Sequence, residues 1–357
     1  MKTKISPFQL AIIIANFILT GSLMITGQII TQITKHTTWQ VPFFILPLLL
    51  GLLFIGMGRK GNLVDVMPSA SKSKRSKIFS ILMSIFLMSV FIRDVRTFVH
   101  YISSNLLPTT PLEIITLILV ITLVYISAAG LEVIGRITVI QFVVLAAIIL
   151  TLPLTLINEL KMSNLLPIFE IKEALNLGKS SFILFPWMGE VFIVFYLFSN
   201  IQDTKGLRKA TYYGTAFGIL LYFVLLILNI LVLGEKIVRL SSYPNITMIQ
   251  QINITEFLDR LDLVIVLIWM PCLIAKLALT LYLIQKAIAN IRSVESVNII
   301  LPLGLLLGVL SIVLFKSTMV FFEFTFFSWT LIGLFLEMSL LVLFLISRKK
   351  KRKAEST

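Results

Sequence analysis

The chain has 357 residues, of which 58% are hydrophobic and only 13% are charged, and its mean hydropathy is +1.00. This composition excludes a water-soluble domain. The apolar residues form runs long enough to cross ~30 Å of hydrocarbon, so the sequence predicts a polytopic helical membrane protein. The short alternating segments of a β-barrel are absent. We attribute the net charge of +14 to loop residues that set topology, and not to a nucleic-acid surface.

Ten spans are predicted in chain order. The first follows MKTK and continues to about Ile30 without a small-residue cleavage site, so we interpret it as a span and not as a signal peptide. The expected boundaries are approximately 7–31, 40–57, 78–102, 112–130, 135–158, 180–200, 209–234, 258–287, 297–315 and 319–347.

The lysines and arginines of the loops predict the orientation. Most of them fall on the side of the N-terminus, and the run RKKKRK at 348–353 follows the last span. The positive-inside rule therefore places both termini in the cytoplasm. We expect one integral membrane domain over 1–357 with a basic cytoplasmic tail at 348–357. The external connections 159–179 and 235–257 are expected to carry short helices on the membrane surface.

Few residues have the chemistry of a metal site or of catalysis. Cys272 is the single cysteine, and His36 and His100 lie far apart without other ligand-like residues. No hydrolytic triad, zinc motif or phosphate-binding loop is present. We therefore expect neither an enzyme nor a protein that needs a metal or another cofactor.

Two spans are interrupted at matched positions. Span 1 carries Thr20-Gly21-Ser22 in mid-membrane and Gly27 after it, and span 6 carries Pro-Trp-Met-Gly at 186–189. Each broken span is the first of five, and the two halves cover 7–158 and 180–347. Because five is an odd number, the second half enters the membrane from the opposite side, so the repeat is inverted. Broken helices in inverted repeats indicate a transporter-type binding site near the midplane, where freed backbone groups meet a polar ligand. The alternative is that glycine and proline only kink or pack these helices.

Ionisable residues inside the spans support a site. Glu190 directly follows the second break, and a carboxylate at this depth costs about 2.5–3.5 kcal/mol on insertion scales. It is expected to be protonated or paired with Arg93, Arg96 or Lys276. Arg93 has Asp94 beside it as a local counter-charge, whereas Arg96 lies near the end of span 3, where snorkelling is an alternative.

Span 8 and span 10 carry the other intramembrane charges. Cys272, Lys276 and Thr280 recur every four residues in span 8 and share one face with Trp269. A buried lysine can titrate or hold a carboxylate, and the alternative is a salt bridge that only fixes packing. Glu337 of span 10 is expected nearer the cytoplasmic side, beside a loop arginine.

The order of the motifs resembles the B subunits of spore germinant receptors (GerAB/GerKB family), a branch of the amino acid–polyamine–organocation transporter superfamily. The resemblance runs from about Ile5 to Ile346. It rests on motifs in the order ISPFQL, TGS, the Arg-acid pair, LLPTTPLEII, AAGLEVIGR, FPWMGE, TEFLDRLDLVIVLIWM and AKLALTLYL. One departure is Gly27, where many relatives have proline.

The resemblance implies a fold class, partners and a site. The fold is an all-α polytopic membrane protein with ten helices, a LeuT-like 5+5 inverted repeat and broken helices 1 and 6. The partners are a larger A-type subunit and a lipoprotein C-type subunit in the inner spore membrane. The ligand contacts, to which we add Thr280 from the face of Lys276, are Thr20, Gly21, Ser22, Arg93, Phe185, Pro186, Trp187, Gly189, Glu190 and Lys276.

Two functions follow from these features. The first is a germinant sensor that binds an amino acid or a similar nutrient between spans 1, 3, 6 and 8, with partner subunits reading the change of conformation. The second is a proton-coupled amino acid transporter in which Glu190 or Lys276 carries the coupling charge. Both use the same binding residues.

Overall fold

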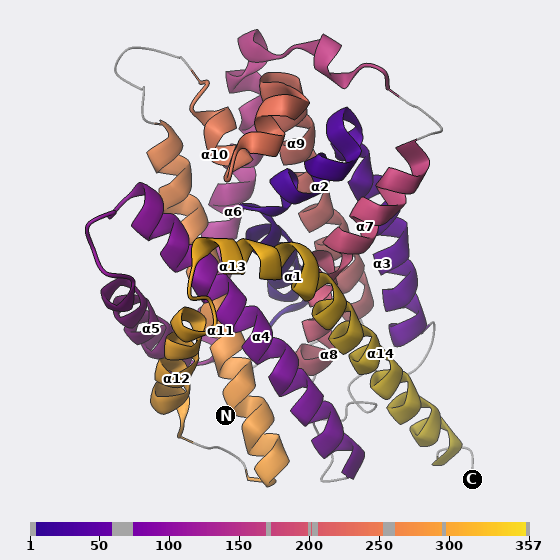
Figure 1. Cartoon of the computed structure of the whole chain (residues 1–357). Helices are drawn as coiled ribbons and strands as arrows, with labels where there is room; N and C mark the ends of the chain where they lie inside the picture. Colours follow the sequence, from indigo (N-terminus) through magenta and orange to yellow (C-terminus); the bar gives the residue numbers. More distant parts are fainter. Residues whose placement is uncertain are drawn as a thin grey trace.

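The structure is a computed structural model that describes residues 5–58, 74–168, 173–198, 201, 206–252, 261–294 and 298–354. Within this part the chain is helical, apart from an isolated parallel bridge between Ile5 and Ile201. The helices form one bundle, and both termini lie toward the same end of it (Figure 1).

The helix bounds follow the predicted spans closely. The α-helices are α1 (Pro7–Ser22), α2 (Thr26–Thr34), α3 (Val41–Met57), α4 (Lys74–Asn105), α5 (Leu112–Ala128), α6 (Leu131–Thr155), α7 (Ala174–Met188), α8 (Val194–Leu197), α9 (Leu207–Leu240), α10 (Pro244–Ile249), α11 (Leu261–Arg292), α12 (Ile300–Val313), α13 (Thr318–Glu323) and α14 (Trp329–Ala354). The 3-10 helices are η1 (Lys35–Gln40), η3 (Ile157–Glu159), η4 (Met162–Leu165) and η6 (Gly189–Ile193), and η8 (Phe324–Ser328) is a π-helical turn.

These elements make up the ten predicted spans. Seven helical segments of the described chain are long and apolar enough to cross a membrane, and α1, α5 and α12 are shorter apolar helices. The predicted first span covers α1 and most of α2, and α2 also continues through η1 into α3 in the long segment Thr26–Met57; the sixth span consists of α7, η6 and α8, and the tenth of α13, η8 and α14. The predicted all-helical membrane fold is therefore confirmed.

The start of α1 is encoded locally. The Ser6 hydroxyl accepts a hydrogen bond from the Gln9 amide at 3.2 Å, and the Ser6 amide donates to Gln9 Oε1 at 2.9 Å. This capping box satisfies backbone donors that the first turn leaves free, and Pro7 at the first helical position needs no partner. The helix that leads to the first break is therefore fixed at its beginning.

The two halves of the chain pack matched elements against each other. Helix α4, third in the first half, packs along α11, third in the second half, and α5 packs against α12. Helix α1 lies against α9, α6, α11 and α7. This pairing is the arrangement that an inverted 5+5 repeat produces, and it brings the two broken spans and the long helices α4 and α11 together.

Both breaks are milder than the sequence suggested. Thr20, Gly21 and Ser22 form the last turn of α1, and the interruption comes at 23–25. The expected position was therefore wrong by a few residues: the backbone stays helical through Ser22, whose hydroxyl donates to the Ile18 carbonyl at 2.6 Å. Pro186 lies inside α7, and after Met188 the chain tightens into η6 instead of unwinding.

The connection after α9 contains a short helix. Gly234, at φ 73°, bends the chain, and α10 follows. A short helix was expected in this connection, and Asn245 and Met248 of α10 are buried, so this helix packs into the bundle. Positions 253–260, which include part of the TEFLDRLDLVIVLIWM motif, and the side chains of the basic tail lie outside the described residues.

Helices α1 and α9 are in backbone contact. A Cβ atom added at Gly214 would lie 2.9 Å from Ala11 Cα, and one added at Gly218 would lie 3.0 Å from Ala15 Cα. Glycines spaced by four residues on one helix face alanines on the other, which lets two membrane helices approach closely.

We predict that Gly214→Ala lowers the thermal stability of the purified protein in detergent. The added methyl has no room, and overpacking of this kind costs about 1–3 kcal/mol. Gly51→Ala in α3 is the matched control, because a Cβ there meets nothing within 4 Å. An equal shift of the unfolding temperature in both variants would refute the close-packing argument.

Candidate ligand site at the helix breaks

The last turn of α1 forms one wall of the candidate site. Thr20 and Ser22 are buried, but their hydroxyls are engaged within the helix: Thr20 donates to the Asn16 carbonyl at 2.6 Å and Ser22 to the Ile18 carbonyl. Gly21 between them has no side chain, so the backbone there is open to neighbouring groups.

Arg93, Asp94, Glu190 and Lys276 meet beside this turn and form a charge network. Arg93 Nη2 lies 2.5 Å from Asp94 Oδ1 and 2.5 Å from Glu190 Oε1. Lys276 Nζ lies 2.8 Å from Asp94 Oδ2 and 2.5 Å from Glu190 Oε2. Each cation thus contacts both carboxylates, and the formal charges of the network cancel.

The charge network is removed from water and walled by aromatic rings. Its side chains are at most 2% exposed. The Arg93 guanidinium lies 4.0 Å from the ring centre of Trp187 and 4.3 Å from that of Trp329. The Lys276 ammonium lies 5.4 Å from the Phe17 ring. Desolvated cations gain from such faces, which offsets part of their burial cost.

Gly21 is the point at which α1 touches the charge network. A Cβ there would collide with Lys276 Nζ and would lie 3.5 Å from both Arg93 Nη2 and Glu190 Oε1. The glycine therefore lets three charged groups from α4, η6 and α11 approach the backbone of the first broken span. The sequence-based prediction that Gly21, Arg93, Glu190 and Lys276 belong together in space agrees with this geometry.

The remaining predicted residues occupy supporting positions. Phe185 and Pro186 are buried in the last turn of α7, and the Phe185 carbonyl accepts the Gly189 amide. Thr280 is buried on the face of Cys272 and Lys276, and its hydroxyl donates to the Lys276 carbonyl at 2.8 Å. Their roles as ligand contacts stay predictions.

Arg96 and Glu337 lie differently from what the sequence suggested. Arg96 is only 4% exposed, so it does not snorkel, and its Nε and Nη1 have no hydrogen-bond partner among the described residues. Glu337 was expected beside a loop arginine near the cytoplasmic side. That expectation was wrong, because its fully buried carboxyl group packs against Gly189 at the second break.

Sequence reasoning missed the side chains that satisfy the backbone around the first break. Asn16 donates to the Cys272 carbonyl at 3.1 Å, Trp269 to the Thr20 carbonyl at 3.4 Å, and Asn245 to the Leu23 carbonyl. Asn229 in turn donates to Asn245 at 2.7 Å. Asparagine within apolar runs was the available signal, because an amide at this depth needs a partner.

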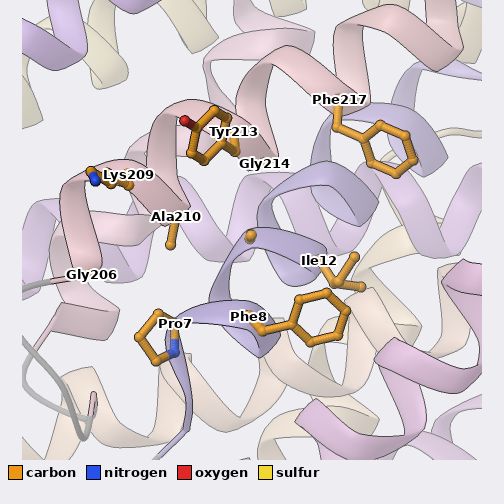
Figure 2. A pocket seen from close by; sticks show the side chains of 10 residues that line it. Pro7, Phe8, Ile12, Gly206, Lys209, Ala210, Tyr213, Gly214 and Phe217 are labelled. Atoms are coloured by element: carbon orange, nitrogen blue, oxygen red, sulfur yellow. The ribbon is translucent and has the colours of Figure 1, made fainter.

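A groove of about 500 Å³ lies away from the charge network, where the first turns of α1 and α9 meet. Figure 2 shows Pro7, Phe8, Lys209 and Tyr213 around it. Phe8 is 61% and Tyr213 70% exposed. The lining is almost entirely apolar and faces outward, so the groove lacks the convergent polar groups of a nutrient site.

We predict that Glu190→Gln destabilises the protein by about 3–5 kcal/mol, because it leaves Arg93 and Lys276 sharing Asp94 as their single counter-charge in a water-free site. Unfolding in detergent measures the change. Glu132→Gln is the matched control: it breaks the exposed Arg136–Glu132 pair, whose side chains are 68% and 44% exposed, and exposed pairs contribute at most about 1 kcal/mol. Similar losses in both variants would contradict the proposed weight of the buried charge network.

Two proteins of known sequence match this chain over most of its length. The chain is 26% identical over 322 residues to spore germination protein KB of Bacillus subtilis (strain 168), covering 87% of this chain and 85% of that protein. It is 29% identical over 232 residues to the YfkT protein of the same organism, covering 65% of this chain. It spans 63% of the length of YfkT.

Solved structures with the same fold are transporters. The nucleobase-cation-symport-1 family transporter Mhp1, in a closed conformation with bromovinylhydantoin bound, matches with a TM-score of 0.59 at 14% identity, over 90% of this chain and 74% of that one. The Eremococcus coleocola manganese transporter matches with a TM-score of 0.52 at 13% identity, over 96% and 75%. At these identities the likeness establishes the LeuT-like fold.

The family model described as spore germination protein matches residues 4–320. The match includes both breaks and every residue of the charge network. The chain is thus an integral membrane protein that belongs to the spore germination protein family.

Proposed function

We propose that this chain is a nutrient-sensing subunit of a spore germination receptor, and that it binds an amino acid or a similar small molecule between α1, α4, η6 and α11. The observation that carries the proposal is the buried charge network at Gly21, which joins both broken spans to α4 and α11. Family membership supports the role in germination, and the fold supports a binding site at the breaks.

The charges favour a zwitterion as the ligand. The charge network is neutral, so a ligand with a net charge would leave an uncompensated charge in a low-dielectric site. An amino acid carries one ammonium and one carboxylate group. Its carboxylate can take the place of Glu190 at Arg93, and its ammonium can take the place of Lys276 at Asp94. Such an exchange leaves Glu190 paired with Lys276, so every charge stays paired, and it breaks the contacts of α4 with η6 and with α11.

This exchange suggests how binding becomes a signal. Arg93 and Glu190 lie 2.5 Å apart and connect the long helix α4 to the second break, and Lys276 and Asp94 lie 2.8 Å apart and connect α11 to α4. A ligand that replaces these contacts stabilises a different arrangement of α4 relative to the other two elements and shifts the population toward it. We propose that A-type and C-type subunits read the new arrangement in the inner spore membrane, with both termini of this chain in the cytoplasm.

A proton-coupled amino acid transporter is the second candidate. It is favoured by one observation, the fold shared with solved transporters. The two candidates use the same site but differ in flux. Uptake of labelled amino acids by the purified protein alone in liposomes supports the transporter. Ligand binding without uptake supports the sensor.

We predict that a thermal-shift screen of amino acids, sugars and nucleosides on the purified protein identifies a stabilising amino acid. A ligand at 100 times its dissociation constant adds about 2.7 kcal/mol to the stability of the folded state. The screen is run beside Glu190→Gln and Lys276→Ala. If a ligand is found and both variants bind it unchanged, these two charges do not form the site.

We further predict that Gly21→Ala abolishes the ligand-dependent shift. The added methyl occupies the position of Lys276 Nζ and separates α1 from the charge network. Gly51→Ala, at a position with open space around it, is expected to bind as the wild type does. Unchanged affinity in a folded Gly21→Ala protein would place the ligand away from the first break.

A further inference from the structure

Glu337 is a buried carboxyl group that the charge network does not use. Its side chain is 0% exposed, and neither carboxyl oxygen has a hydrogen-bond partner among the described residues. A Cβ at Gly189 would lie 2.8 Å from Glu337 Oε1 and closer still to Oε2. The carboxyl group therefore fills the space that the missing side chain of Gly189 leaves at the start of η6.

In the part of the chain that the structure describes, no cation forms a salt bridge with Glu337. Helix α7 contributes Pro186 and Trp187, and Pro186 packs against Gly333, one turn before Glu337. Helix α3 has no ionisable residue in its sequence. The charged groups that act on Glu337 are Glu190 from η6 and Arg93 from α4, and neither forms a salt bridge with it.

An ionised carboxylate in this position would be costly. Desolvation without a partner opposes the charge, and the neighbouring Glu190 carboxylate repels it. Arg93 is the nearby cation, but its Nε and Nη2 already bond Asp94 and Glu190. A proton on Glu337 removes the charge, so the neutral acid is the form that fits this site.

We propose that Glu337 is a proton-binding site, separate from the ligand site, that holds a proton in this conformation and controls the charge network through Arg93. Arg93 Nη1 is buried and has no hydrogen-bond partner among the described residues, so one donor of the guanidinium is unused. When the Glu337 proton leaves to bulk water, the new carboxylate competes with Glu190 for Arg93. Proton release thus weakens the ion pair that connects α4 to the second break.

The inference does not depend on the identity of the nutrient, or on sensing as opposed to transport. It concerns Glu337, whereas Glu190 and Lys276 contact each other. The test of Glu337 uses the proton itself as the ligand. A negative result for this proton site is therefore distinguishable from a negative result for the proposed nutrient site.

The test combines infrared spectroscopy and thermal unfolding of the full-length protein in lipid nanodiscs. The wild type is expected to show the carbonyl band of a protonated, buried carboxylic acid, shifted in D₂O, and Glu337→Gln is expected to lose it. Glu323→Gln, at an exposed glutamate of α13, is the matched control and keeps the band.

The pH dependence of stability has a defined sign. In the folded protein Glu337 keeps its proton, whereas in the unfolded chain an exposed glutamate releases it. The folded state therefore loses stability as the pH rises. The unfolding temperature of the wild type is therefore expected to fall from neutral to alkaline pH more steeply than that of Glu337→Gln, and the Glu323→Gln profile is expected to follow the wild type.

Two results overturn the proposal. One is a wild-type spectrum without the band, or a band that persists in Glu337→Gln. The other is stabilisation of the wild type by Na⁺ or K⁺ at alkaline pH that Glu337→Gln lacks, which would make the site a cation site and not a proton site. If Glu337→Gln does not fold, isotope labelling of glutamate in the wild type still decides whether the band belongs to a glutamic acid.

Discussion

Four mutually paired charges set the geometry of this protein. Arg93 and Asp94 come from α4, Glu190 from η6 and Lys276 from α11, and each cation reaches both carboxylates. A buried ion whose partner is missing costs several kcal/mol, so all three elements must arrive in one register. Hydrophobic packing gives a membrane bundle little such specificity, because lipid is as apolar as the helices.

The charge network also explains why the last turn of α1, just before the first break, contains a glycine. Lys276, Arg93 and Glu190 crowd the backbone at Gly21, where any side chain would displace them. Gly189 has the same role at the second break, with Glu337 in place of the network. The two glycines thus perform related tasks at the two breaks: each lets a charged or ionisable side chain from another helix lie against the chain. Flexibility is not needed to account for either position.

The sequence predicted the spans and the charged positions better than the backbone between them. Long apolar runs and the charged residues inside them can be seen in the sequence itself, and the predicted pairing of Glu190 with Arg93 and Lys276 is present in the structure. The breaks were harder, because the first helix continues through Ser22 and the chain at Gly189 tightens into a 3-10 helix. The neighbour of Glu337 was predicted wrongly, since it depends on how α14 packs against η6, which no local pattern encodes.

The side chain of Asn245 has a mechanical consequence for the first broken span. It donates to the Leu23 carbonyl at the interruption, and its Oδ1 accepts a hydrogen bond from Asn229 of α9. Below the interruption, Ala11 and Ala15 of α1 rest directly on the glycines of α9. The lower part of this span is therefore held against α9, and its upper part, α2, also packs on α9, where the Thr26 and Tyr222 hydroxyls lie 2.6 Å apart. The three-residue interruption at 23–25 lies between these two contacts, and Asn245 connects it to α10 at the far end of the bundle from the termini (Figure 1).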